Sequence, residues 1–102
     1  MNALNALLNR RALQVYIEGP ASVEPYSTNT WLAVASYGSP PYTYRWYWNG
    51  QFVGTGATYT AQAGEPDFQL RVEVTDAAAA TVSAGGTILV SCVPTTDPAC
   101  PI

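Results

Sequence analysis

A chain of 102 residues has room for one domain with a modest core. Hydrophobic residues make up 48% of the chain and charged residues 11%, which argues against disorder, and the net charge of −3 argues against a nucleic-acid partner, because phosphate binding needs a basic face. The sequence has no His and no Lys, which removes the commonest general base and any Schiff-base chemistry.

Residues 1–12 are predicted to form an N-terminal arm ahead of the first strand. Leu4, Leu7 and Leu8 lie at helical spacing and Asn2 suits an N-cap, so one or two turns of helix are our first expectation. An extended arm is the alternative. A helix this short is marginal by itself in water, so the leucines need a surface to pack on, in this domain or in a neighbouring subunit.

The arm does not have the order of residues found in a secretory signal. Arg10 and Arg11 follow its apolar part, whereas a signal carries its positive charge first. No apolar run in the chain approaches the length of a membrane-spanning helix. We therefore expect no membrane span.

Seven short strands are predicted after the arm. In the first, Leu13, Val15 and Ile17 alternate with more polar residues, which is the pattern of a half-buried strand. Gly85-Gly86 interrupts the last strand and predicts a bulge or bend there. The predicted strands are 13–18, 29–36, 42–48, 51–53, 57–61, 68–75 and 81–90.

The third strand carries the densest run of aromatic side chains. Tyr or Trp occupies positions 42, 44, 46 and 48, which share one face of a strand because side chains alternate with a period of two. We expect this face to point into the core, with Trp46 at its centre. The opposite face carries Thr43, Arg45 and Tyr47. Asn49-Gly50 follows directly and is a strong hairpin signal.

Short strands separated by turn signals predict an all-β fold, an antiparallel β-sandwich over residues 13–91. No segment between strands is long and apolar enough for a helical crossover. The residues that we expect in the core are Trp31, Trp46, Leu70, Val72 and Val74.

Residues 92–102 form a tail rich in Pro and Thr that carries both cysteines, Cys92 and Cys100. A disulfide loop within the tail is our first expectation, and it would imply an oxidising, extracellular setting. Two free thiols and bonds to another chain are the alternatives. Two cysteines without any His are too few for a structural zinc site.

Two segments of the chain resemble a known family. GSPPYTYRW at 38–46 and FQLRVEVTD at 68–76 are similar to the G-x-P-Y-x-Y-x-W and L-x-V-x-V-x-D strands of bacterial immunoglobulin-like and polycystic-kidney-disease-type (PKD-like) domains. The resemblance implies an immunoglobulin-like sandwich with strand 42–48 beside strand 68–75, and Arg45 facing Glu73. It also implies a role as spacer, adhesive repeat or accessory module of a secreted protein. The intersheet disulfide of antibody domains is missing, because both cysteines lie in the tail.

The sequence predicts no enzyme activity and no cofactor. Ser and Thr residues have no His or Lys to activate them, and the carboxylates are scattered. Glu65, Asp67 and Asp76 could meet at one end of the sandwich and bind calcium through oxygen ligands. The alternative, which we favour, is that they are solvated turn residues.

Exposed aromatic residues are candidates for contact with a glycan or a protein. Most of the aromatic residues fall on inward faces, so a core role is favoured for them. Tyr47, Tyr37 and Tyr16 are better candidates for an exposed platform, and aromatic residues are also enriched in protein interfaces.

Self-assembly is the leading functional expectation. A sandwich of this size exposes sheet edges, which natural proteins often protect with Lys, and this chain has none. An apolar arm that docks on the next copy, or adds a strand to its edge, would make a head-to-tail contact and an open filament. Assembly is expected through residues 3–13, and the interface candidates there are Leu4, Leu7 and Leu8 of the arm and Leu13 at the start of the first strand. The predicted setting is extracellular, at a cell surface.

Overall fold

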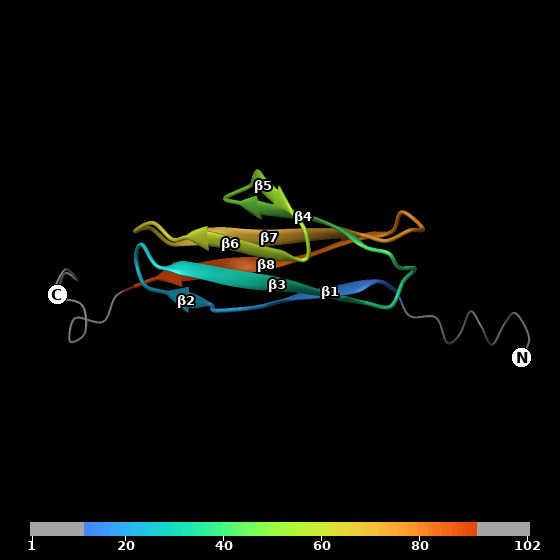
Figure 1. Ribbon diagram of the computed structural model, residues 1–102, viewed down its shortest axis with the longest axis horizontal. Helices are drawn as coiled ribbons and strands as arrows, with labels where there is room; N and C mark the ends of the chain where they lie inside the picture. The colour runs from blue at the N-terminus through green and yellow to red at the C-terminus, as the bar shows by residue number, and fades with distance from the viewer. Residues whose placement is uncertain (1–11, 92–102) are drawn as a thin grey trace, which may run out of the picture.

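The computed structural model describes residues 12–91, which form two layers of β-strands (Figure 1). None of these residues is helical, so this span contains no helix that could cross a membrane. The strands in it are β1 (Gln14–Glu18), β2 (Ser22–Val23), β3 (Thr28–Ser36), β4 (Thr43–Trp48), β5 (Gln51–Thr55), β6 (Thr58–Gln62), β7 (Phe68–Thr75) and β8 (Thr81–Val90).

The strands form one sheet of three strands, in the order β1-β3-β6, and one of five, in the order β2-β8-β7-β4-β5. All pairings are antiparallel except that of β2 with β8. This confirms the predicted all-β, immunoglobulin-like sandwich. The chain passes from the first sheet in β1 to the second in β2. The sequence did not predict β2, because two residues are too few to show an alternating pattern.

Large aromatic side chains fill the space between the sheets. Trp46 is fully buried and Trp31 is 1% exposed. Tyr59 of β6 stacks against both, with its ring centroid 5.8 Å from that of Trp46 and 6.5 Å from that of Trp31, and burial raises the pKa of Tyr59. Trp48 and Phe68 form a second stack with centroids 3.7 Å apart. The other residues expected in the core are also buried: Leu70, Val72 and Val74.

Leu13 belongs to this core and not to an intermolecular contact. Its side chain is only 5% exposed, because position 13 extends the inward face that Val15 and Ile17 occupy in β1. A Cβ added to Gly38 would lie 3.1 Å from the Leu13 Cβ, which shows how closely the β3–β4 loop covers it. The interface assignment of Leu13 is therefore wrong.

The β4–β5 hairpin turns at Asn49-Gly50, as predicted. Asn49 has a φ of 49° and Gly50 a φ of 82°, and two successive positive φ angles are the mark of a type I′ turn.

The sequence predicts a bulge or bend at Gly85-Gly86, and the bulge is wrong, because β7 and β8 pair in unbroken register from Phe68–Ile88 to Thr75–Thr81. Gly85 serves a different purpose. A Cβ at this position would lie 2.8 Å from the Arg71 Cα and would also contact the Leu70 carbonyl oxygen. Glycine therefore allows β8 to approach β7 closely.

The described domain begins and ends at opposite poles of the sandwich (Figure 1). A Cβ on Gly38 would touch both Leu13 and Asp76, so the start of β1, the β3–β4 loop and the β7–β8 turn meet at one pole. At the other pole, the Ser91 N–H donates to the Val23 carbonyl 2.9 Å away. The first and last described residues therefore lie at opposite ends of the sandwich.

Candidate interaction site

The outer face of the five-stranded sheet carries a row of residues that crosses the sheet from β5 to β8. We call it the outer row, and by strand register it consists of Phe52, Tyr47, Arg71 and Gly85. The Arg71 guanidinium carbon lies 4.3 Å from the Tyr47 ring centroid, as in a cation–π contact. Phe52 meets the same ring edge-to-face, with centroids 6.0 Å apart.

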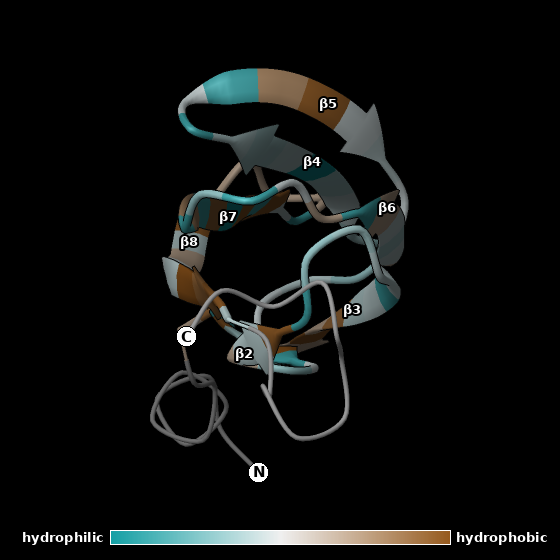
Figure 2. Ribbon diagram, turned by 90° about the vertical axis from the view of Figure 1, so that its left-hand side faces the viewer, coloured by the Kyte–Doolittle hydropathy of each residue, from teal (hydrophilic) through white to brown (hydrophobic). Residues whose placement is uncertain are grey.

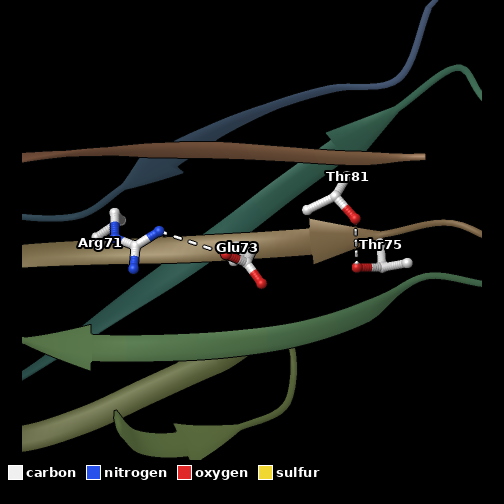
Figure 3. A network of polar contacts seen from close by, with 4 residues as sticks. All are labelled: Arg71, Glu73, Thr75 and Thr81. Carbon is white, nitrogen blue, oxygen red and sulfur yellow. Dashed lines mark hydrogen bonds and ion pairs between the residues drawn. The ribbon is translucent and has the colours of Figure 1, made fainter. Parts of the chain in front are cut away.

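Polar pairs surround the outer row on the same face. Arg45 and Glu73 are register partners, as the family resemblance implied, but the ion pair of Glu73 is with Arg71 of its own strand, at 3.4 Å (Figure 3). The hydroxyls of Thr75 and Thr81 hydrogen-bond across β7 and β8 at 3.0 Å. An exposed ion pair of this kind contributes about 0–1 kcal/mol to stability, so it is available for exchange with a ligand.

An open depression of about 360 Å³ lies beside Arg71. Gly85 and Gly86 form part of its floor, where no side chain rises from β8. The Tyr47 ring itself is not a free platform, because Arg71 lies over it. Phe52, which is 52% exposed, supplies the open aromatic surface instead. The Phe52 ring, the Arg71 guanidinium and the depression lie on one face. Together they suit contact with a ligand that offers both apolar and polar groups.

The structure does not bring Tyr37 to this row. Tyr37 lies in the loop between β3 and β4, at the pole that holds Leu13, and its carbonyl accepts a hydrogen bond of 2.7 Å from the Tyr42 hydroxyl. Tyr47 therefore belongs to the outer face of the five-stranded sheet, and Tyr37 to the pole of Leu13.

The acidic residues considered for calcium do not meet. Asp67 precedes β7 and Asp76 follows it, so eight strand residues, about 26 Å of extended chain, separate them. Each carboxylate already has a structural role. Asp67 accepts the Val90 N–H at 2.7 Å, and Glu65 accepts the Tyr26 hydroxyl at 2.8 Å, a hydrogen bond that raises the pKa of Tyr26. Residues 12–91 contain no cluster of three or more potential metal-binding side chains.

One sheet edge is left unpaired along β8, beyond its short pairing with β2. The Leu89 N–H donates to the Ala21 carbonyl, so odd-numbered residues of β8 direct their backbone groups away from β7. Because the register with β7 is unbroken, this alternation extends back along the strand. It leaves four residues whose backbone N–H and C=O groups have no strand partner within residues 12–91. We call them the open edge: Thr81, Ser83, Gly85 and Thr87.

The edge at the other side of the same sheet is protected by a bulge. Phe52 pairs with Tyr47 and Gly54 with Trp46, which leaves Val53 as the extra residue of β5. Figure 2 shows β5 at the margin of the molecule with its apolar residues in brown. A bulge distorts an edge and opposes strand addition, so β5 is protected without Lys.

An apolar groove of about 220 Å³ adjoins the open edge. It lies between β8 and the segment 17–21, which comprises the end of β1 and its connection to β2. Gly86 is on the inward-facing side of β8, yet a Cβ there would find no heavy atom within 4 Å, so the space in front of it is empty. We call this space the Gly86 groove, and its apolar lining comes from Ile17, Trp31, Leu70 and Ile88.

Several predicted site residues lie outside the described residues: Leu4, Leu7, Leu8, Cys92 and Cys100. Sequence reasoning missed the Gly86 groove and the roles of Phe52 and Arg71. The signal for the groove was the Gly-Gly pair inside an apolar strand, which we interpreted as a bulge. A strand glycine also marks a place where another group can approach closely.

No protein-family model and no curated protein matches the chain. Among solved structures, the chain is similar to the CARDB domain of a Pyrococcus furiosus protein, solved in complex with di-metal ions. The TM-score is 0.64 at 19% sequence identity, and the match covers 78% of this chain and 92% of that one. A likeness at this identity establishes the fold alone. The chain therefore has a CARDB-like β-sandwich fold.

Proposed function

We propose that the protein is a non-catalytic structural module that assembles with other copies of itself outside the cell, through its N-terminal arm and a sheet edge. The observation that carries this proposal is the open edge of β8 with the Gly86 groove beside it. Unpaired backbone groups next to an apolar groove are a template for an added segment. A fold by itself assigns no activity, so the support for a structural role comes from the sheet edge and the groove.

The positions of the two poles favour linear growth. Residues 1–11 are attached at the pole of Leu13, whereas the Gly86 groove lies along β8 towards the pole of Ser91. A contact between two different surfaces of one chain is heterologous, and repeated heterologous contacts give open chains unless the rotation closes a ring.

Deletion of residues 1–11 is the direct test. The truncated chain keeps Leu13 and the whole core, so we expect a folded monomer where the full chain forms polymers. Light scattering measures the mass, negative-stain microscopy shows the polymers, and circular dichroism checks the fold. A truncated chain that assembled like the full chain would refute a role for the arm.

The outer row supports a second function, binding of a glycan or of a polar protein segment. Its open ring, Phe52, stands at the end of an aromatic and guanidinium row that leads to a depression. Aromatic rings that border polar groups are the usual elements of such sites.

Phe52→Ala is expected to weaken retention on a glycan panel by roughly 3- to 10-fold, since it removes the open aromatic ring. Tyr47→Ala is expected to weaken it by a similar factor, since it removes the ring on which both Phe52 and Arg71 are positioned. Tyr16→Ala is the matched control, because Tyr16 is equally exposed, at 53%, on the other sheet. Equal retention of all three variants and the wild type would exclude the outer row.

A further inference from the structure

We propose that the Gly86 groove receives a leucine side chain from residues 4–8 of a second copy of the chain, while backbone groups of the open edge at Gly85 and Thr87 hydrogen-bond to the incoming segment. This inference rests on the proposed function and specifies it: the arm is the inserted element and the groove is its receptor.

The groove has the chemistry of a receptor for an aliphatic side chain. Ile17, Leu70 and Ile88 form apolar walls, and the indole of Trp31 is held in place because its Nε1–H donates to the Pro20 carbonyl at 2.9 Å. With that donor satisfied, the indole, which is 1% exposed, forms part of the closed apolar back of the groove. Outward-directed backbone groups at Gly85 add directional hydrogen bonds. In strand addition, such main-chain bonds supply affinity and side-chain pockets supply specificity.

The arm matches the groove in its apolar pattern, and its charge is opposite to the net charge of the domain. In an extended segment, Leu4, Ala6 and Leu8 share one face. Such a segment would present two leucines to the groove, with the small Ala6 between them. Residues 12–91 carry two arginines and six carboxylates, a formal charge of −4, whereas residues 1–11 carry +2 from Arg10 and Arg11. The residues that line the groove are uncharged, so the charge acts at longer range: opposite net charge on the arm and on the domain favours their encounter.

The direction of the chain favours a second copy over the same copy. β1 runs from the pole of Leu13 towards the groove, so a segment that precedes Leu13 would have to reverse immediately to reach its own groove. Residues 2–12 contain no Gly and no Pro, the residues that most often make such reversals. A neighbouring copy can be reached without a reversal.

Gly86→Leu tests the groove in the full-length chain. The new side chain fills the empty space that an incoming leucine would occupy, and no heavy atom lies within 4 Å of the added Cβ. We expect the concentration needed for assembly to rise by about 10- to 100-fold, the equivalent of one buried leucine. The unfolding midpoint should not fall, because glycine in a strand interior is destabilising relative to a residue with a side chain. Gly86→Ala is the matched control, since a methyl group leaves most of the groove open and assembly near the wild-type level.

A complementation experiment separates this inference from the proposed function. A chain with Leu4, Leu7 and Leu8 all replaced by Asn keeps its groove and loses its arm contact, while Gly86→Leu keeps its arm and loses its groove. Each is expected to be monomeric alone, and a mixture should give a one-to-one dimer by light scattering, because only one productive contact remains.

Each other outcome has a distinct meaning. Two outcomes would show that the groove is the wrong receptor while the arm keeps its role. In the first, Gly86→Leu assembles like the wild type and the arm variant stays monomeric. In the second, both variants are monomeric and their mixture gives no dimer. If the wild type were monomeric, or the arm variant assembled like the wild type, both the inference and the proposed function would fail.

Discussion

Trp46→Ala is expected to lower the free energy of unfolding by about 3–5 kcal/mol, the range for truncating a large buried aromatic side chain. Trp46 is fully buried, and its ring stacks against Tyr59 across the two sheets. Its Nε1–H donates to the Gly56 carbonyl at 2.8 Å, so truncation also removes a hydrogen bond to the loop between β5 and β6. Urea denaturation followed by tryptophan fluorescence or circular dichroism measures the loss.

Trp46→Phe separates the two contributions. The phenyl ring keeps part of the stack on Tyr59 and loses the hydrogen bond, so the expected loss is smaller than for Ala. A Trp46→Ala chain that unfolded at nearly the wild-type urea concentration would show that the aromatic stack does not hold the sheets together.

The second large effect is expected at Asp76. Its carboxylate is 7% exposed and accepts backbone N–H groups from Ser39, Ala78 and Ala80 at 2.9–3.0 Å. It therefore ties the β7–β8 turn to the β3–β4 loop at the pole of Leu13. Asp76→Ala leaves these donors without their acceptor, and we expect a loss of about 2–5 kcal/mol, because hydrogen bonds to a charged group contribute about 1.5–3 kcal/mol each and are not additive.

Asp67→Ala is the control for Asp76. Asp67 is also an acceptor at the end of β7, but it is exposed and receives a single N–H, from Val90. Its loss should be about 0.5–1.5 kcal/mol. The loss of stability for Asp76→Asn should lie between those for Asp67→Ala and Asp76→Ala, since an amide keeps one acceptor oxygen. Equal losses for Asp67→Ala and Asp76→Ala in thermal unfolding would contradict the structural role of Asp76.

Asp76 illustrates how a residue can be misjudged from its place in the sequence. It follows a strand directly, as metal-binding and solvated turn residues both do, and these were the two readings that the sequence offered. The structure shows a third role. Because the β3–β4 loop folds over the β7–β8 turn, the carboxylate is enclosed and satisfies backbone donors from both.

Leu13 and Gly86 illustrate the same limit for the interaction site. Leu13 continues both the arm and the first strand, and only the packing of the β3–β4 loop assigns it to the core. A glycine inside a strand is compatible with a bulge, a close approach or an empty space. Which of these applies depends on the residues that lie opposite the glycine in the folded chain. Opposite Gly86 lies the end of β1 and its connection to β2, and the space between them is open.

The sequence by itself determined the fold class and most of the strands. Alternation with a period of two assigns inward and outward faces wherever a strand has one buried side, and Asn49-Gly50 specifies its own turn because local φ angles decide it. Tertiary structure alone decided which residues meet across the layers. The stack of Tyr59 on Trp46, the sheet change at β2 and the Gly86 groove all join segments far apart in the chain, and no local pattern encodes such contacts.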